Sequence, residues 1–143
     1  MAFTSLRTLD TMNQDTEALP EIDINKFRER FPQMFSDPAV DEIYCDPGWR
    51  GILIALCETI QDYLRRHPEV TPVNVAQIKS KFGELHFFYD GGDVYCRGAV
   101  DVAIQLSTKT CSYCGAPGKL VGSTWVNTLC SRHDGSTRSR CSD

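Results

Sequence analysis

The longest regular pattern of apolar positions in the chain lies between residues 47 and 68, in the stretch PGWRGILIALCETIQDYLRRHP. Apolar residues recur there at steps of three and four, which places them on one stripe of a helix. They are Trp49, Ile52, Leu53, Leu56, Ile60, Tyr63 and Leu64. Two arginines occupy the last turn, where positive charge suits the helix dipole, and a proline follows. The pattern predicts a long amphipathic helix.

A shorter helix is predicted upstream, in EIDINKFRERFPQMFSDP. Asp23 is a suitable N-cap for a helix that begins near Ile24, and Pro32 should end or interrupt it. The phenylalanines of this stretch are expected to pack on the main body. Residues 1–20 are polar and show no apolar periodicity, so we predict a flexible leader there.

After the long helix the period changes from helical to alternating. The stretch VTPVNVAQIKSKFGELHFFYDGG is rich in β-branched and aromatic residues and contains a glycine between two apolar runs. It predicts a β-hairpin with strands near residues 73–79 and 85–89. Gly83 is the expected position of positive φ in the turn.

A second helix is predicted over residues 94–109, with Asp93 as its N-cap. Val94, Val100, Ala103 and Ile104 are expected to face inward. The resulting order, helix, hairpin, helix, favours an α+β fold in which two or three helices pack on a small antiparallel hairpin or sheet.

A candidate metal site follows, in CSYCGAPGKLVGSTWVNTLCSRH. Cys111 and Cys114 form a Cys-x-x-Cys pair, and Cys130 and His133 form a second pair after 15 intervening residues that contain turn-forming glycines. Such spacing is typical of a zinc ribbon. Cys141 is an alternative fourth ligand. Four protein ligands close the coordination shell, so we expect a structural Zn²⁺, and we identify no catalytic residues in the chain.

Composition and charge refine this division of the chain. We expect a leader (1–20), an α+β body (21–107), a zinc ribbon (108–134) and a disordered tail (135–143). Residues 1–106 contain 10 Lys and Arg against 17 Asp and Glu, a net charge of −7, whereas residues 107–143 contain 5 against 2, a net charge of +3. Seven cysteines, no apolar run long enough to cross a membrane and no signal peptide favour a soluble cytoplasmic protein that does not bind membranes.

The hairpin and the turn after it carry the candidate partner-binding residues. They are Lys79, Lys81, His86, Phe88, Asp90 and Asp93. Basic residues interleaved with aromatic residues are typical of surfaces that bind single-stranded nucleic acid. The alternative interpretation places the aromatic side chains in the core and leaves the lysines solvated at a strand edge. We prefer the alternative because the surrounding segment is acidic.

The chain also resembles a group of small zinc-ribbon proteins encoded by bacteriophages, prophages and bacteria. The resemblance rests on FRERFPQMF, GWRGILIALCETIQ, VAQIKSKFGELHFFY, CSYCGAPG and WVNTLCSRH, and covers roughly residues 27–133. It implies the same four metal ligands. It also implies a setting of mobile-element and bacterial-conflict genes, where small acidic proteins often act by binding another protein.

Three functional hypotheses follow. The leading one is a non-enzymatic protein that binds a partner, such as a toxin immunity protein or an inhibitor of a defence or nucleic-acid-handling enzyme. The second is a nucleic-acid-binding zinc-ribbon accessory protein. The third is an enzyme whose active site is assembled from scattered residues.

Overall fold

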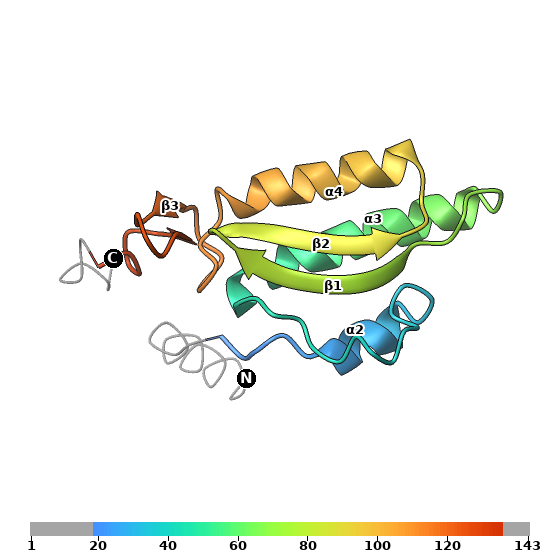
Figure 1. The fold of residues 1–143 in the computed structure, drawn as a ribbon, viewed down its shortest axis with the longest axis horizontal. Coiled ribbons are helices and arrows are strands. Elements are labelled where there is room, and N and C mark those ends of the chain that lie inside the picture. Colours follow the sequence, from blue (N-terminus) through green and yellow to red (C-terminus); the bar gives the residue numbers. More distant parts are fainter. Residues whose placement is uncertain (1–18, 136–143) are drawn as a thin grey trace, which may run out of the picture.

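The computed structural model describes residues 19–135, and the fold is α+β, as the sequence predicts (Figure 1). The described residues form three α-helices, one short 3₁₀ helix and two antiparallel sheets of two strands each. Most of the predicted leader (1–18) and of the predicted tail (136–143) lies outside the described residues.

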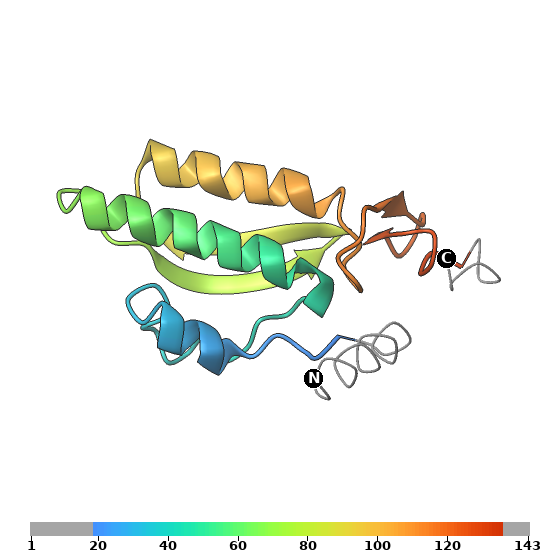
Figure 2. The same cartoon turned by 180° about the vertical axis from the view of Figure 1, so that it is seen from behind.

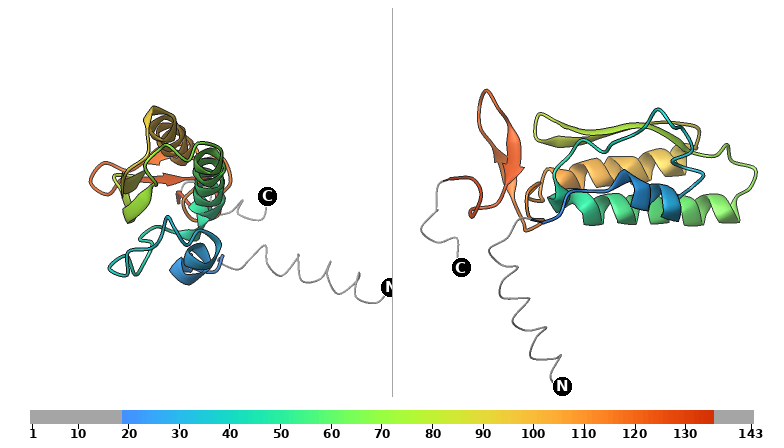
Figure 3. Two further views of the ribbon diagram at one scale, coloured as in Figure 1. Left: turned by 90° about the vertical axis from the view of Figure 1, so that its right-hand side faces the viewer. Right: turned by 90° about the horizontal axis from the view of Figure 1, so that it is seen from below.

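The body has two layers, a hairpin and a pair of helices. The helices α3 (Arg50–Arg66) and α4 (Val94–Ser107) lie side by side on one face of the hairpin, formed by β1 (Asn74–Lys81) and β2 (Glu84–Asp90) (Figures 1 and 2). The helix α2 (Ile24–Arg30) lies beside α3. The second hairpin, β3 (Lys119–Val121) and β4 (Asn127–Leu129), lies at one end of the body, next to the turn between β1 and β2 (Figure 3).

The hydrophobic core lies between the layers and receives side chains from every segment of the body. Its largest fully buried members are Trp49, Phe31, Phe35, Leu53, Ile60, Ile78, Leu85, Val73, Val75, Cys57 and Cys96. Because residues from both ends of the body contribute, α2 belongs to the same folding unit as the hairpin and the two long helices.

The helix α2 begins and ends as the sequence predicts. The Asp23 carboxylate accepts a hydrogen bond from the backbone N–H of Asn25, 2.9 Å away, which satisfies one free donor of the first turn. The helix ends before Pro32. The Phe27 ring then packs against Phe31 and Phe35, with ring centroids 6.1 and 5.6 Å apart. These rings share the buried core with the inner face of α3, and the Gln61 side chain of α3 donates a hydrogen bond to the Arg30 carbonyl.

The long helix starts at Arg50, one residue after Trp49, the first apolar position of its pattern. Residues Pro47–Trp49 form the 3₁₀ helix η1, and α3 continues from Arg50. Trp49 is completely buried, and Leu53, Leu56, Cys57 and Ile60 form the face of α3 that packs into the core. The predicted apolar stripe is therefore the face of α3 that points into the core.

The hairpin is tighter than predicted. Lys81 pairs with Glu84, so the loop contains only Phe82 and Gly83, which both have positive φ values of 56° and 75°. Two positive φ values in a two-residue loop define a type I′ turn, the form that matches the natural twist of paired strands. The prediction for Gly83 is confirmed, whereas the unusual conformation of Phe82 was not expected.

A bulge in β1 keeps its apolar residues on one face. Val75 and Ile78 are both buried although they are three positions apart, a spacing that would place them on opposite faces of a regular strand. The register shifts between Val75 and Gln77, and the extra residue returns Ile78 to the inner face. On β2, Leu85 and Phe87 face the same core.

The helix α4 is capped by Asp93, as predicted, because its carboxylate accepts hydrogen bonds from the backbone N–H groups of Tyr95 and Cys96. Val100 and Ala103 are buried and Ile104 packs against the core. The inward orientation predicted for Val94 is wrong, since this side chain is 85% exposed. Val94 is the first residue of α4 and lines the exposed groove between α3 and α4 instead of the core.

Candidate metal centre and apolar groove

Four side chains come together at the C-terminal end of the described chain, and we call them the Cys3His cluster: Cys111, Cys114, Cys130 and His133. Their ligand atoms all lie within 4.8 Å of one another. The Sγ atoms of Cys114 and Cys130 are 3.7 Å apart, and the Sγ of Cys111 lies 3.6 Å from Nδ1 of His133. Zn–S bonds of about 2.3 Å in a tetrahedron place two sulfurs about 3.8 Å apart. The cluster therefore has the dimensions of a four-coordinate metal site.

The first two ligands lie on a tight turn. The Gly115 N–H donates to the Cys111 carbonyl at 2.9 Å, and the Cys111 N–H donates to the Ala116 carbonyl at 2.7 Å. Gly115 has a φ of 86°, and a Cβ there would lie 3.1 Å from the Gly48 carbonyl oxygen. Only glycine adopts this positive φ without strain and also leaves room for the Gly48 carbonyl. The turn therefore requires glycine directly after the second cysteine.

The second pair of ligands is brought back by the β3–β4 hairpin. Lys119 pairs with Leu129, which places Cys130 next to the first turn. The backbone N–H groups of His133 and Asp134 then donate to the Cys130 carbonyl at 3.0 and 2.9 Å, forming the turn that presents the imidazole. The Tyr113 ring packs at a tilt against the His133 ring, with centroids 4.5 Å apart. Each half of the cluster is thus set by local backbone geometry.

The backbone also favours the thiolate form of one cysteine. Burial by itself raises the pKa of the Cys111 thiol, but backbone N–H groups of Cys130, Cys114 and Tyr113 that point at its sulfur lower the pKa below its usual value. Burial and the neighbouring sulfurs raise the pKa of Cys114 to about 11. Burial and the adjacent Arg132 lower the pKa of His133, which favours the neutral imidazole that binds metals.

The cluster is seated on the N-terminal end of α3. The indole Nε1–H of Trp49 donates to the Thr110 carbonyl at 2.9 Å, and the Gly48 N–H donates to the Ser112 carbonyl at 2.7 Å. A Cβ at Gly48 would lie 2.3 Å from the Cys111 carbonyl oxygen, closer than atoms can approach. Gly48 is thus needed for the metal turn although it lies more than 60 residues before it in the sequence.

A second contact joins the β3–β4 hairpin to the turn of the first hairpin. The buried Thr128 hydroxyl donates to the Gly83 carbonyl at 2.6 Å, and the Ser112 N–H donates to the Thr128 carbonyl at 2.9 Å. A Cβ at Gly83 would lie 2.7 Å from the side chain of Leu120. The roles of Gly48 and Thr128 could not be predicted from sequence patterns, because both residues act through contacts between segments that are distant in the sequence.

The six candidate partner-binding residues do not form one surface. Lys79, Lys81, His86 and Phe88 share the face of the hairpin that points away from the helices. Asp90 is exposed at the other end of β2, where it pairs with Asn74. Asp93 instead caps α4, and its carboxylate accepts a 2.5 Å hydrogen bond from the Tyr63 hydroxyl. The Asp93 carboxylate therefore stabilises the start of α4 and its contact with α3.

Three further cysteines that the structure describes lie apart from the cluster. Cys57 and Cys96 are fully buried and Cys45 is partly buried, each as a free thiol. Burial raises the pKa of Cys45 and of Cys57 to about 12, so both are uncharged thiols at neutral pH. Cys141, the alternative fourth ligand, lies outside the described residues, and His133 occupies the fourth position of the cluster.

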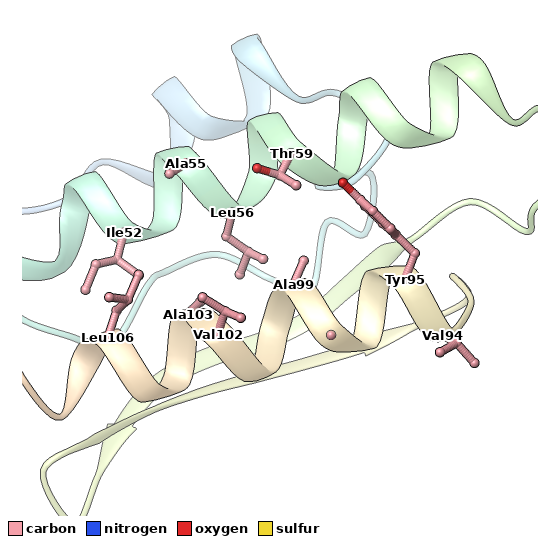
Figure 4. Close-up of a pocket in the computed structure, with 11 residues that line it drawn as sticks. Ile52, Ala55, Leu56, Thr59, Val94, Tyr95, Ala99, Val102, Ala103 and Leu106 are labelled. Carbon is pink, nitrogen blue, oxygen red and sulfur yellow. The ribbon is translucent and has the colours of Figure 1, made fainter.

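A feature that the sequence analysis missed is an apolar groove between α3 and α4 (Figure 4). It is lined by Ile52, Ala55, Leu56, Thr59, Val94, Tyr95, Gly98, Ala99, Val102, Ala103 and Leu106. Val102 is 60% exposed, and Tyr95 and Leu106 are nearly half exposed. A signal was present in the sequence: Tyr95, Ala99, Val102 and Leu106 follow helical spacing on a second stripe beside the core stripe.

Comparisons of the chain with known protein families, with curated proteins and with solved structures found no match. Among the residues that the structure describes, no helix combines the length and apolar character needed to cross a membrane.

Proposed function

We propose that this protein is a non-enzymatic binding protein that recognises a partner protein through the apolar groove, while the Cys3His cluster holds a structural Zn²⁺. The observation that carries the proposal is the exposure of large apolar side chains along one continuous strip of two packed helices. Contiguous exposed apolar surface of this kind marks interaction sites in proteins.

The assignment of zinc rests on the donor set. Three thiolates and one imidazole at tetrahedral spacing are the ligands that zinc prefers. With all four positions supplied by the protein, such an ion has no place for a substrate or a reactive water. The cluster supports a structural ion that holds the C-terminal hairpin together.

The shape of the groove favours a helix of the partner as its occupant. The two helices run antiparallel, so Ile52 faces Leu106 at one end and Thr59 lies near Tyr95 at the other (Figure 4). Between them the floor is formed by Leu56 and Ala103, which are both buried, while Ala55 is exposed at the edge. Residues 95 to 106 rise about 16 Å along the helix axis, which suits three turns of an amphipathic helix.

The charge of the leader and the body together favours a basic partner. Residues 1–106 carry a net charge of −7, which attracts positively charged proteins over long range and speeds encounter. Together with the resemblance to phage and bacterial zinc-ribbon proteins, this charge supports a toxin, or an enzyme of a defence or nucleic-acid-handling system, as the partner. Binding would block the partner's active surface.

The proposal is tested with a charge placed in the groove. Val102→Asp should leave the fold intact because the side chain is mostly exposed, and should abolish capture of a host protein that the wild-type chain retains. Calorimetry with the identified partner should then show at least a tenfold loss of affinity, because the complex would bury an unpaired carboxylate.

The matched control is Gln105→Asp, which adds the same charge to the same helix at an exposed position outside the groove. This variant should bind the partner as the wild type does. Loss of binding in both variants, or in neither, would contradict the proposed docking site.

A further inference from the structure

Two phenylalanines of the first hairpin are exposed, Phe88 on the face that points away from the helices and Phe82 in the turn at the end of the strands. We call this face together with the turn the outer hairpin face and define it by Lys79, Lys81, Phe82, His86 and Phe88. Phe82 is 71% exposed and Phe88 is 45% exposed. The helices pack on the opposite side of the two strands (Figure 3). These rings add nothing to the core, which Leu85 and Phe87 fill from the other side of the strand.

Each exposed ring is paired with a basic side chain. The Lys79 ammonium lies 5.7 Å from the centroid of the Phe88 ring, and the Lys81 ammonium lies 5.5 Å from that of Phe82. His86 lies two residues before Phe88 on the same face of β2, and the two rings are stacked with centroids 5.9 Å apart. Flat rings that alternate with positive charges offer stacking for bases and contacts for the phosphates between them.

The backbone of Phe82 is a separate observation. Its φ of 56° lies in the left-handed region, which a bulky side chain occupies at a cost. Asn, Asp or Gly is the favoured residue at this position of a type I′ turn. A solvent-exposed ring is thus held where a smaller residue would make a more stable hairpin. Strain of this kind, with no gain for the core, points to a role in binding.

The β3–β4 hairpin extends this surface. It rises on the same side of the helices as β1 and β2 (Figure 3), and its turn carries Trp125, which is 84% exposed. Leu120 of β3 contacts the Gly83 turn, so the two hairpins meet directly beside Phe82. Lys119, also exposed, adds a third positive charge. The Cys3His cluster fixes the position of this second hairpin.

We infer that the outer hairpin face binds single-stranded nucleic acid over a short site, with bases stacked on Phe88 and Phe82 and phosphates held by Lys79 and Lys81. Acidic groups limit the site: Glu84 lies 3.7 Å from His86, and Asp41 and Glu42 flank Tyr44 at the edge of β1. Few charges and a short face imply modest affinity. This inference is independent of the apolar groove, which lies on the helix layer.

The test is fluorescence anisotropy of the full chain, loaded with zinc, titrated into a labelled single-stranded oligonucleotide of mixed sequence. Binding is expected at low salt, with affinity falling roughly tenfold between about 50 and about 200 mM salt, since two or three phosphate contacts release counterions when they form. Duplex DNA of the same sequence, whose bases are not free to stack, should bind much more weakly. No binding at low salt, or equal binding to duplex, would overturn the inference.

Two variants separate stacking from charge. Phe88→Leu keeps an apolar side chain but removes the ring, and should weaken binding about tenfold. Lys79→Gln combined with Lys81→Gln should weaken binding and flatten the salt dependence, whereas Lys26→Gln, an exposed lysine on α2, should change neither. Unchanged affinity of Phe88→Leu, or equally tight binding of heparin, a polyanion without bases, would show that stacking is not involved and would overturn the inference.

Phe82→Asn provides a readout that a purely structural role would not give. Relief of the left-handed strain should raise the melting temperature while the loss of the ring weakens oligonucleotide binding. A variant that melts higher and binds as tightly as the wild type would contradict the role of Phe82. Val102→Asp should bind the oligonucleotide normally, so failure of the groove and failure of this site are distinguishable.

Discussion

At the scale of single residues, Gly48 links the body to the metal turn. Its N–H donates to the Ser112 carbonyl, and no space exists for a side chain beside the Cys111 carbonyl. The atoms that a Cβ at Gly48 would meet are backbone atoms of Cys111 and Ser112, which cannot move aside as a flexible side chain could. We expect Gly48→Ala to lower the free energy of unfolding by about 1–3 kcal/mol, as overpacking of a tight contact does, and to weaken zinc retention in a chelator competition.

Gly51 supplies the control for this prediction. It lies three residues later in α3, and a Cβ there meets nothing within 4 Å. Gly51→Ala should therefore stabilise the protein by about 0.5–1 kcal/mol through helix propensity. Equal effects of the two substitutions in urea unfolding would mean that the close approach at Gly48 does not matter.

Asp93 gives a pH-dependent contribution to stability. The hydrogen bond from the Tyr63 hydroxyl, opposed by burial and assisted by the backbone N–H groups of Cys96 and Tyr95, lowers the pKa of its carboxyl. A lowered native pKa means that the stabilisation is fully present above the ordinary pKa of Asp and is lost as the pH falls through the native value. Asp93→Asn should therefore be less stable than wild type at neutral pH, and the difference should shrink in acid.

Urea unfolding between about pH 7 and about pH 2 would measure this difference. Asp101→Asn, an exposed carboxylate on the same helix, should leave the shape of the pH profile as it is in the wild type. A constant difference between Asp93→Asn and wild type across the whole range would show that the carboxylate does not titrate with folding.

At the scale of elements, the β3–β4 hairpin has almost no apolar core and depends on its ligands. Removal of zinc with a chelator should release amide protection at residues 111–133 while β1, β2 and α3 stay protected, because the free energy of metal binding supplies the folding free energy of such small units. Hydrogen exchange measures both regions at once. We expect about one zinc per chain, and Cys130→Ser should abolish its binding.

The control for metal binding is Cys45→Ser, since Cys45 is a free thiol apart from the cluster. This variant should retain zinc in elemental analysis. Complete unfolding of the body on chelation, or unchanged protection of the β3–β4 hairpin, would contradict the division between a self-sufficient body and a metal-dependent hairpin.

Local patterns predicted most elements and the four members of the cluster because their causes are local. Asp23 and Asp93 cap helices through bonds within three residues, and Gly83 is required by its own turn. The groove escaped prediction for another reason. A single apolar stripe on α4 is enough to predict a helix from the sequence. Only the packing of α4 against α3 shows that Val102 belongs to a second apolar stripe, which no described residue covers.

At the scale of the whole molecule, the two layers present different chemistry to solvent. The helix layer offers an apolar groove, and the hairpin layer offers aromatic rings beside lysines. The two layers lie on opposite sides of the body (Figure 3), so a partner bound to one leaves the other open. Lys119, on β3 beside the turn of the first hairpin, adds a further positive charge on the hairpin side.

The seat of the Cys3His cluster has a consequence for the order of folding. Trp49 bonds a carbonyl 61 residues later in the chain, and Thr128 reaches back 45 residues to the Gly83 carbonyl. Contacts between such distant positions form slowly, because a long loop must close before they are gained. The body can fold as soon as α4 has been synthesised. Cys130 and His133, the last two ligands, lie later in the chain and are synthesised after that point. Docking of the metal-binding segment on the body, which needs these distant contacts, is therefore expected to be the final step of folding.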